Sequence, residues 1–336
     1  MIKVGINGFG RIGRLAARVI LSKYKDKLDL AAINTSGSVD AASWVHLFKY
    51  DTAYGKYESE VACEGENLVV DGKKIPLLAQ RDPALIPWGE YGVEVVIEST
   101  GVFRKKQDIE KHLRDSVKRV ILSAPGKGDE EIKTIVIGVN DKERGDEKIT
   151  SSASCTTNCV APVTKVILEN FGIKKALFTT IHAYTPDQEL QDGSHKDLRR
   201  ARAAASNIVP TSTGAAKATA KTLPALAGKF DGMAIRVPVL VGSLSDITYV
   251  VEKQTSAEEI NEAFKKAADG ELKGILEVTS EPLVSSDIIG SQASAIIDLS
   301  LTKVVGGDLI KVVAWYDNEW AYANRLVEEA VAVKKG

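Results

Sequence analysis

The sequence has few cysteines, almost no net charge and no long apolar run. Its three cysteines, Cys63, Cys155 and Cys159, fit a reducing compartment better than a disulfide framework. A formal net charge of -1 gives no broad attraction for nucleic acid or for an anionic membrane. No apolar run approaches the length of a bilayer span, and the first residues, MIKVGING, resemble a strand rather than a charged and then apolar leader. We therefore expect a cytoplasmic protein with no membrane partner and no primary nucleic-acid role.

A metal site has little support in this sequence. Cys155 and Cys159 are four residues apart, so a helix would place both thiols on one face. A structural zinc site needs about four ligands, and no second close pair of Cys or His accompanies these two. We expect no bound metal.

The first half alternates β-rich runs with helical patterns. The runs IKVGI, LDLAAI, VEVVIES, RVILSA and TIVIGV are almost continuously apolar, as strands covered on both faces are. RIGRLAARVIL and KKQDIEKHLRDSV between them have the pattern of helices. The 336 residues suffice for two domains, and this alternation predicts that the first is built on a parallel sheet with helices on both faces.

The second half has a different character. IRVPVLVGSLSDITYVVEK, ILEVTS, SAIIDLS and LIKVVAWYD resemble longer strands, and SAEEINEAFKKAADG is helical. We therefore predict an α/β chain with a Rossmann-type dinucleotide-binding domain over 1–154, completed by a C-terminal helix over 318–336. Residues 155–317 are predicted to form an α+β catalytic domain with a mostly antiparallel sheet. The long segment TPDQELQDGSHKDLRRARAAASNIVPTSTG lacks periodicity, and loops of this length in compact domains are usually functional.

Cys155 is a candidate nucleophile. It follows the small polar run ITSSAS and precedes an apolar helical pattern that stops at Gly172, which predicts a helix capped by Ser152 or Ser154. Free N–H groups and the helix dipole stabilise an anion there, so we expect a lowered thiol pKa. His182, after the β-rich LFTTI, is a candidate base. The alternative is a small buried residue that starts a core helix.

A glycine fingerprint predicts dinucleotide binding. Gly8, Gly10 and Gly13 form G-x-G-x-x-G between the strand IKVGI and the helix RIGRLAARVIL, where glycine allows a backbone approach to pyrophosphate. The second strand ends at Asn34 and Thr35, where an NAD-selective site usually has Asp or Glu. Thr35 would not repel a 2′-phosphate. The alternative is a polar turn that has no role at the adenosine end of the cofactor.

Five motifs in one order, NGFGRIGR, SASCTTNC, HAYTPDQ, PTSTGAAKA and WYDNEW, strongly resemble the phosphorylating glyceraldehyde-3-phosphate dehydrogenases. The resemblance covers essentially the whole chain. It implies a cytoplasmic homotetramer that oxidises glyceraldehyde 3-phosphate with NAD(P)+ and inorganic phosphate to 1,3-bisphosphoglycerate, a step of glycolysis and gluconeogenesis.

The resemblance also implies roles for individual residues. Cys155 matches the family nucleophile, which forms a thiohemiacetal and then a thioester, and His182 matches the base. Residues that match or suit phosphate contacts are Ser154, Thr156, Thr185, Arg202, Thr213, Gly214 and Arg236. Thr213 is also a candidate N-cap of the helix in GAAKATAKTL, and the RRAR segment that holds Arg202 has a solvated loop as its alternative. Predicted cofactor contacts are Gly8, Gly10, Arg11, Ile12, Gly13, Asn34, Thr35, Arg81, Ser123, Ser194 and Asn318.

The chain departs from its family at the cofactor turn. NAD-preferring members usually have Asp at the position of Thr35, and many have Pro at that of Ser194. NADP-using photosynthetic members resemble this chain in having Ser at the second position. Ser36, Ser38 and Ser194 offer neutral hydroxyl donors to a 2′-phosphate. We therefore expect NAD or NADP as the cofactor, with NADP+ used efficiently, alongside NAD+ or in preference to it.

Three other functions compete with this interpretation. Erythrose-4-phosphate dehydrogenase shares the cysteine and histidine, so only substrate kinetics separates it. Aspartate-semialdehyde dehydrogenase shares the architecture but not SCTTNC or WYDNEW. A non-catalytic RNA-binding or nucleotide-sensing module is disfavoured by the Cys155 and His182 pair and by the absence of net positive charge.

Overall fold

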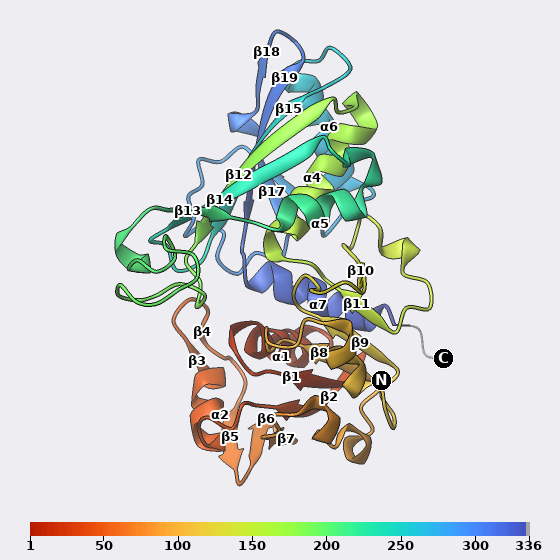
Figure 1. The fold of residues 1–336 in the computed structure, drawn as a ribbon, viewed down its shortest axis with the longest axis vertical. Coiled ribbons are helices and arrows are strands. Elements are labelled where there is room, and N and C mark those ends of the chain that lie inside the picture. The colour runs from red at the N-terminus through yellow and green to blue at the C-terminus, as the bar shows by residue number, and fades with distance from the viewer. Residues whose placement is uncertain (334–336) are drawn as a thin grey trace. The chain divides into compact units, whose positions relative to one another are not determined.

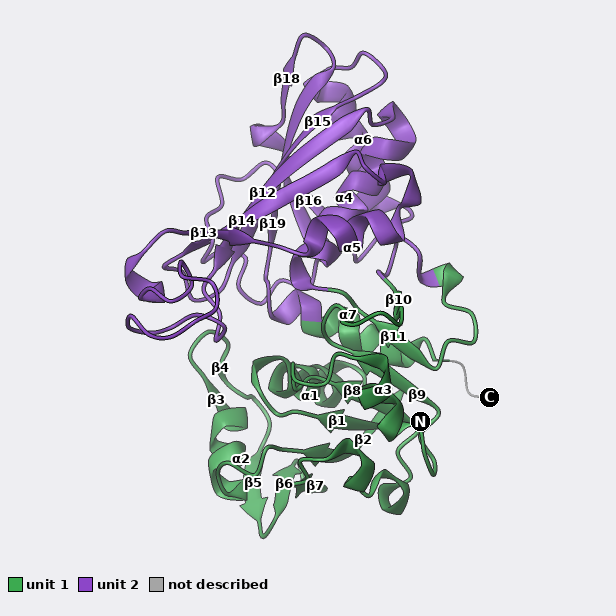
Figure 2. Cartoon of the chain, in the orientation of Figure 1, with its two compact units in different colours: residues 1–135, 142–153, 323–336 green, residues 136–141, 154–322 purple. Residues whose placement is uncertain are grey.

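A computed structural model describes residues 1–333, which fall into two compact units. Unit 1 contains residues 1–135, 142–153 and the chain from 323 onward, and unit 2 contains residues 136–141 and 154–322 (Figure 2). Each unit has its own sheet (Figure 1). The predicted fold class, a Rossmann domain with an α+β domain, is confirmed.

The sheet of unit 1 is parallel over most of its width. Its spatial order is β10 (Lys133–Thr134), β11 (Ile149–Ser151), β9 (Arg119–Leu122), β8 (Val95–Glu98), β1 (Ile2–Asn7), β2 (Leu28–Asn34), β7 (Lys73–Leu78), β6 (Asn67–Val70) and β5 (Val61–Glu64). Neighbours from β10 to β7 are parallel, and β7, β6 and β5 are antiparallel. Strand order reverses beside β1, and ligands of open α/β sheets bind at the carboxyl ends of strands at such a point.

Helices and turns complete unit 1. They are α1 (Arg11–Lys23), α2 (Ala41–Lys49), α3 (Lys106–Ile109), the hairpin of β3 (Tyr50–Asp51) and β4 (Gly55–Lys56), and the short turns η1 (Pro83–Leu85), η2 (Trp88–Tyr91), η3 (Glu110–His112) and, in the segment 141–143, η4 (Asp141–Glu143). Most of α7 (Trp320–Val331) belongs to unit 1. Its Glu328 accepts a hydrogen bond from the Tyr24 hydroxyl at 3.0 Å, and its Asn324 accepts one from Lys23 Nζ at 2.8 Å.

Unit 2 has a sheet covered by helices on one face. The strand order is β13 (Val209–Ser212), β14 (Phe230–Val237), β12 (Lys175–Ala183), β15 (Ser243–Val250), β19 (Leu309–Tyr316), β17 (Ala295–Asp298) and β16 (Leu276–Thr279), with β18 (Lys303–Val305) also on β19. Two pairs, β12 with β14 and β16 with β17, are parallel, and the others are antiparallel. The helices are α4 (Cys155–Phe171), α5 (Ala215–Thr222) and α6 (Ala257–Asp269), with the short turns η5 (Ala204–Ser206), η6 (Pro224–Leu226) and η7 (Leu299–Leu301).

Alternation along the strands explains why one face is covered. In β12, Ala176 and Phe178 are buried in the core with α4 and α5, while Leu177 is 66% exposed. Side chains of a strand point to opposite faces in turn, so every second residue enters the core.

Three predicted elements differ in the structure. In the predicted strand TIVIGV, only Thr134 is in a strand, because the side chains of Asn140 and Asp141 accept hydrogen bonds from the N–H groups of Val136 and Gly138, both at 2.8 Å. These N–H groups therefore cannot donate to a neighbouring strand.

The helix predicted in KKQDIEKHLRDSV is only α3 followed by η3. Asp115 has a φ of 52°, a left-handed conformation that no α-helix continues through.

The predicted C-terminal helix is shorter within the described residues. It begins at Trp320 rather than at 318, because the Asp317 carboxylate accepts hydrogen bonds from the N–H groups of Glu319 and Trp320. It ends at Val331, and residues 334–336 of the prediction lie outside the described part of the chain.

Candidate active site

The cysteine motif begins α4 as predicted. Ser154 is the N-cap, and its hydroxyl accepts a hydrogen bond from the Thr157 N–H at 3.1 Å. Cys155 is therefore the first helical residue, and the helix ends at Gly172, whose φ is 68°. Of the two candidate caps, Ser152 is excluded because it lies two residues earlier and donates to Glu329. The thiol stands at the end of the helix where N–H groups lack intrahelical partners.

His182 lies beside the thiol. Cys155 Sγ is 3.4 Å from His182 Nε2. The other ring nitrogen, Nδ1, is 2.6 Å from the Ala183 carbonyl oxygen, which can only accept. Nδ1 therefore carries the proton, and Nε2 presents its lone pair to the thiol. This tautomer is the one that a general base requires.

Burial keeps this pair neutral. Together with the charges of Arg236 and Arg200, burial lowers the pKa of His182 to about 3. Burial also raises the pKa of the Cys155 thiol above its usual value, although Arg236 acts in the opposite direction. The expectation of a lowered thiol pKa is therefore wrong, because desolvation outweighs the helix terminus. At neutral pH the site holds a thiol facing a neutral imidazole.

Arg236 is placed to receive an anion. It pairs in register with His182 on the neighbouring strand, and its Nη1 donates to the Ala183 carbonyl at 3.1 Å and to the Thr185 hydroxyl at 3.3 Å. Its Nη1 is also 3.0 Å from His182 Nδ1, where two donors face each other, and this nearby positive charge adds to burial in lowering the pKa of His182. Arg236 Nε is buried and has no hydrogen-bond partner within residues 1–333. Such a donor is costly unless a ligand satisfies it.

The long loop brings a different arginine to this region from the predicted one. The Arg202 side chain is 62% exposed and pairs with Asp192. Arg200 instead donates from Nε to the Thr211 hydroxyl at 2.9 Å, pairs with Asp187, and contributes to the lowered pKa of His182. Sequence reasoning missed Arg200 and Asp187, since RRAR offers adjacent arginines with no signal to choose between them.

The other predicted phosphate contacts lie at two helix starts. The Thr156 hydroxyl is buried and bonded to the Tyr316 hydroxyl at 2.9 Å. Gly214, rather than Thr213, is the N-cap of α5, and Thr213 Oγ1 accepts from the Ala215 N–H at 3.2 Å. Helices α4 and α5 share one apolar core, so both termini belong to unit 2.

The glycine fingerprint forms the turn from β1 to α1. A Cβ on Gly13 would lie 1.9 Å from the Gly8 carbonyl oxygen, and Gly8 has a φ of 96°, so both positions need glycine for the fold. A Cβ on Gly10 would meet nothing within 4 Å. Contacts within the protein therefore do not explain why this position is a glycine. The close approach of a pyrophosphate to the backbone does explain it. The turn fits a dinucleotide.

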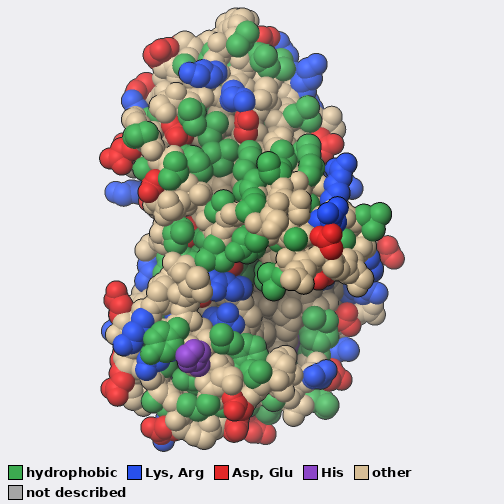
Figure 3. Space-filling model, turned by 90° about the vertical axis from the view of Figure 1, so that its left-hand side faces the viewer, with side chains coloured by type: hydrophobic (Ala, Val, Ile, Leu, Met, Phe, Trp, Pro, Cys, Tyr) green, Lys and Arg blue, Asp and Glu red, His purple; other side chains and the backbone are tan. Residues whose placement is uncertain are grey.

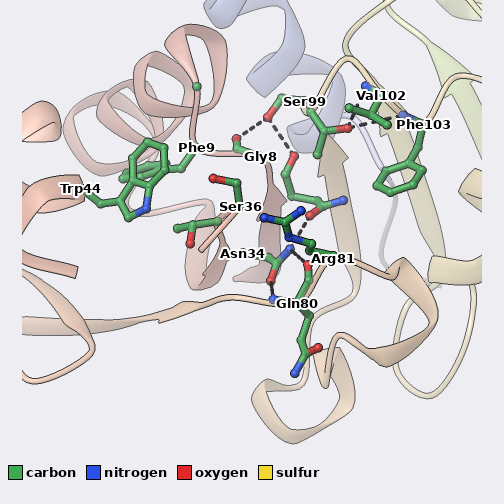
Figure 4. Close-up of a pocket in the computed structure, with 14 residues that line it drawn as sticks. Gly8, Phe9, Asn34, Ser36, Trp44, Gln80, Arg81, Ser99, Val102 and Phe103 are labelled. Carbon is green, nitrogen blue, oxygen red and sulfur yellow. Dashed lines mark hydrogen bonds between the residues drawn. The ribbon is translucent and has the colours of Figure 1, made fainter. Parts of the chain in front are cut away.

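A cavity of about 460 Å³ adjoins this turn, within unit 1. Its lining includes five of the predicted cofactor residues: Gly8, Gly10, Asn34, Thr35 and Arg81. Ser36, a hydroxyl that the sequence offers to a 2′-phosphate, also lines it, and further lining residues, which the sequence reasoning did not assign, are Asn7, Phe9, Trp44, Gln80, Ser99, Thr100, Val102 and Phe103. In Figure 4 the Arg81 guanidinium reaches back toward Asn34 and Ser36. Thr100, Val102 and Phe103 follow the carboxyl end of β8, where the sheet rule could have located them.

Most polar side chains of the turn after β2 already form hydrogen bonds within the protein. Thr35 Oγ1 donates to the Leu78 carbonyl at 3.0 Å and accepts from the Gly37 N–H at 3.2 Å. The hydroxyls of Ser36 and Ser38 are bonded to each other at 2.8 Å. Thr35 therefore shapes the turn and offers no charge, while Arg81 supplies a cation.

The remaining predicted cofactor residues do not line this cavity. Arg11 pairs with Asp51 at 2.5 Å, and Ile12 is the next residue of α1. Ser123 follows β9, and its N–H donates to the Glu98 carbonyl at 2.9 Å. Ser194 and Asn318 are in unit 2, where Asn318 Oδ1 accepts from the Gly242 N–H at 3.1 Å and from the Ser243 hydroxyl at 2.9 Å.

The described part of the chain contains neither a metal-binding cluster nor a helix that could span a membrane. No cluster of three or more His, Cys, Asp or Glu within residues 1–333 is arranged to hold a metal ion. None of the helices in that range combines the length and apolar character that a bilayer crossing demands.

A Rossmann-type pocket in one unit and a part-buried thiol beside a buried imidazole in the other define a dinucleotide-binding dehydrogenase class. Comparison with known families narrows this class. Residues 2–106 match the glyceraldehyde 3-phosphate dehydrogenase NAD binding domain, and residues 154–318 match the C-terminal domain of the same family. The chain belongs to the glyceraldehyde 3-phosphate dehydrogenase family.

Individual relatives agree over nearly the full length. The chain is 56% identical over 335 residues to a glyceraldehyde-3-phosphate dehydrogenase of Streptomyces coelicolor, covering 99% of this chain and 98% of the relative. It is 54% identical over 334 residues to glyceraldehyde-3-phosphate dehydrogenase 2 of Streptomyces avermitilis, with the same coverage. It is 54% identical over 331 residues to a chloroplastic glyceraldehyde-3-phosphate dehydrogenase of Arabidopsis thaliana, covering 98% of this chain and 83% of the relative.

Proposed function

We propose that the protein catalyses the phosphorylating oxidation of D-glyceraldehyde 3-phosphate to 1,3-bisphosphoglycerate, a reaction of glycolysis and gluconeogenesis. The observation that carries the proposal is the 3.4 Å contact between Cys155 Sγ and His182 Nε2, in a chain of this family. A neutral imidazole with its acceptor nitrogen toward a thiol is the arrangement that nucleophilic attack on an aldehyde needs.

Cys155 and His182 divide the chemistry between them. As Sγ attacks the aldehyde carbon, His182 Nε2 takes the thiol proton and returns it to the new oxygen, which gives a thiohemiacetal. Nε2 then removes the hydroxyl proton as the carbon is oxidised, leaving a thioester on Cys155. The nicotinamide group, when bound, accepts the hydride. Inorganic phosphate attacks the thioester, and His182 returns its proton to the departing Cys155 sulfur.

The charged groups of unit 2 hold the two phosphates in this proposal. Arg236 and Thr185 bind the substrate phosphate, and Arg236 Nε, which lacks a hydrogen-bond partner among the described residues 1–333, supports this assignment. Inorganic phosphate is held by Ser154, Thr156, Thr213 and Gly214, at the starts of α4 and α5. Helix N-termini favour anions.

The cofactor is NAD+ or NADP+, held at the carboxyl ends of β1 and β2. Gly10 provides the close backbone approach, and Thr35 replaces the carboxylate that would repel a 2′-phosphate. Arg81 is the cation of the pocket and suits that phosphate. In the proposed domain organisation, residues 1–154 with 318–336 bind the cofactor, and residues 155–317 carry the chemistry. The proposed location of the enzyme is the cytoplasm.

Self-association as a homotetramer is part of the proposal. The sheet face opposite α4, α5 and α6 carries exposed apolar side chains, among them Leu177 at 66%, Met233 at 41% and Leu309 at 39%. Hydrophobic side chains also gather across the side of unit 2 that forms the upper half of Figure 3. Contiguous apolar patches of this kind usually mark protein–protein contacts, and a second copy of the chain is the occupant we propose.

Sedimentation of a Leu177→Glu variant tests the assembly. A charge on this face should convert the tetramer into smaller species. The matched control is Leu85→Glu, since Leu85 is 64% exposed in unit 1. If Leu177→Glu leaves the sedimentation coefficient unchanged, this face is not the contact.

Steady-state kinetics tests the reaction itself. Reduction of NAD+ and of NADP+ should be measured side by side, with and without phosphate, on glyceraldehyde 3-phosphate and on erythrose 4-phosphate. The proposal expects phosphate-dependent turnover that favours glyceraldehyde 3-phosphate. A higher kcat/KM on erythrose 4-phosphate would reassign the substrate, and no turnover on either aldehyde would refute the proposal.

A further inference from the structure

Three polar residues stand side by side where the central strands of unit 1 end. Asn7 ends β1, and in the sheet register it pairs with Asn34 on one side and with Glu98 on the other. Asn7 Nδ2 donates to Glu98 Oε2 at 2.5 Å, and Asn34 Nδ2 donates to Asn7 Oδ1 at 2.7 Å. The three side chains form a row of hydrogen bonds, and two of them, Asn7 and Asn34, line the nucleotide pocket.

Glu98 is a fully buried carboxylate at one end of this row. It is 0% exposed and accepts from the Thr100 N–H at 2.8 Å, from the Thr100 hydroxyl and from Asn7. His112, also 0% exposed, has Nε2 at 3.2 Å from Glu98 Oε2. A buried carboxylate persists when its lone pairs are satisfied, and these donors satisfy both oxygens.

Trp88 fixes the tautomer of His112. The indole Nε1 donates to His112 Nδ1 at 3.0 Å, and an indole nitrogen can only donate. His112 Nδ1 is therefore the acceptor, so Nε2 carries the proton and donates it to Glu98. The direction of every hydrogen bond from Trp88 to Glu98 is determined.

The row connects two walls of the pocket. On one side, the Thr100 hydroxyl held by Glu98 accepts from the Val102 N–H at 3.1 Å, which shapes the wall of Thr100, Val102 and Phe103. On the other side, Asn34 binds the backbone of Gln80 through its Oδ1 at 2.9 Å and its Nδ2 at 2.8 Å, next to Arg81. Glu98, His112 and Trp88 do not themselves line the pocket.

We propose that Glu98 and His112 are positioning residues that hold both walls of the nucleotide pocket in the geometry that binds the adenosine diphosphate part of the cofactor. The inference rests on the proposed function, because it concerns the same cofactor. Glu98 organises Thr100 directly and Gln80 with Arg81 through Asn7 and Asn34. His112 holds the Glu98 carboxylate in place without touching the ligand.

Binding of ADP-ribose, which lacks the nicotinamide, tests this role. His112→Leu removes the donor to Glu98 and should weaken ADP-ribose binding about tenfold, since a hydrogen bond to a charged group is worth roughly that factor or more. His112→Gln keeps an N–H donor near the position of Nε2 and should remain within about threefold of wild type by the same reasoning. The KM for glyceraldehyde 3-phosphate and kcat at saturating cofactor should stay unchanged in both.

A packing control separates positioning from loss of stability. Ile109 is 0% exposed in the same apolar core as Trp88, and none of its side-chain atoms can hydrogen-bond. Ile109→Ala creates a cavity and lowers the free energy of unfolding, yet it should leave ADP-ribose affinity unchanged. If His112→Leu does not fold, Trp88→Phe takes its place. Phenylalanine cannot donate to His112 Nδ1, so the imidazole remains but its tautomer is no longer fixed. Trp88→Phe should weaken ADP-ribose binding more than His112→Gln does.

Three results would overturn the inference. The first is an unchanged ADP-ribose affinity in His112→Leu, or in Trp88→Phe as its substitute. The second is an equal loss of ADP-ribose affinity in His112→Leu and Ile109→Ala. The third is that His112→Gln binds ADP-ribose no better than His112→Leu. Wild-type protein that binds neither NAD+, NADP+ nor ADP-ribose would overturn the proposed function together with it.

Discussion

The two units each contain a buried histidine, and the partner of Nδ1 gives the two rings opposite tautomers. In unit 2, the Ala183 carbonyl accepts the Nδ1 proton of His182, which leaves Nε2 as an acceptor facing Cys155. In unit 1, the Trp88 indole donates to Nδ1 of His112, so Nε2 becomes a donor that holds Glu98. The same side chain can thus take a proton from a nucleophile or fix a carboxylate.

The comparison also separates a reactive site from a rigid one. Around His182 and Cys155, a polar donor of Arg236 has no partner in the described chain, so the site has capacity for a ligand. Around His112 and Glu98, each polar atom discussed above has a partner. A buried donor without a partner in the protein indicates a site that binds a ligand. Buried polar groups that all have partners in the protein indicate a site whose geometry is fixed.

The largest effect is expected for Cys155→Ser. A serine hydroxyl is a much weaker nucleophile and cannot form the thioester, so dehydrogenase activity should fall by more than about 10⁴-fold. ADP-ribose binding to unit 1 should persist. Cys63→Ser is the matched control, since Cys63 is exposed in unit 1 and should leave the rate unchanged. Comparable losses in both variants would contradict the assignment of the nucleophile.

His182→Asn should reduce single-turnover oxidation by about 10² to 10⁴-fold. The asparagine amide can still donate to the Ala183 carbonyl, but its oxygen is too weak a base to take a proton from Cys155. Alkylation of Cys155 by iodoacetamide should slow in parallel. His112→Gln, the corresponding change in unit 1, should keep the single-turnover rate at saturating cofactor. A rate for His182→Asn equal to wild type across pH would remove its role as base.

Thr35→Asp should shift the ratio of kcat/KM from NADP+ toward NAD+ by about tenfold, because the new carboxylate can accept from a ribose 2′-hydroxyl and repels a 2′-phosphate. The ratio, rather than either value alone, is the measurement, since the change also removes the Thr35 hydrogen bond to Leu78. Ser38→Ala is the control, because Ser38 does not line the pocket. An unchanged ratio, or no NADP+ turnover by wild type, would show that the turn does not set cofactor choice.

The last effect is on stability at mild acid pH and leaves the activity at neutral pH unchanged. His182 has a pKa of about 3 in the folded protein and 6.5 as its ordinary value. Below pH 6.5 the unfolded chain binds a proton that the folded site does not, so the free energy of unfolding falls as pH falls. The contribution approaches about 1.4 kcal/mol per pH unit between these values. Denaturant unfolding of wild type and His182→Asn at pH 5 and pH 7.5 should show a smaller pH dependence in the variant; equal dependence would contradict the buried neutral ring.

The sequence predicted those features that local chemistry determines. The glycine turn, a serine cap at Ser152 or Ser154, and a helix that begins at Cys155 and stops before Gly172 depend on neighbouring residues; the structure confirms the turn and the helix and selects Ser154 as the cap. Prediction from the sequence failed where side-chain hydrogen bonds compete with the apolar pattern for the backbone N–H groups. Asn140 and Asp141 turn TIVIGV away from a strand, although its apolar pattern favours one.

The site shows the same division. Cys155 and His182 carry a strong motif signal, but the thiol pKa depends on burial, which sequence spacing does not reveal. Arg200 could not be chosen over Arg202, because only the folded loop directs one guanidinium to Thr211 and the other to Asp192. The row of Asn34, Asn7 and Glu98 arises from strand register and has no signature in any one segment.

Mass spectrometry of the protein mixed with glyceraldehyde 3-phosphate and NAD+ without phosphate tests the central claim most directly. The thiol–imidazole pair predicts one acyl group per chain, located on Cys155, absent in Cys155→Ser and discharged when phosphate is added. Reduced cofactor formed with no acyl group on Cys155, or with the group on Cys63 or Cys159, would contradict it.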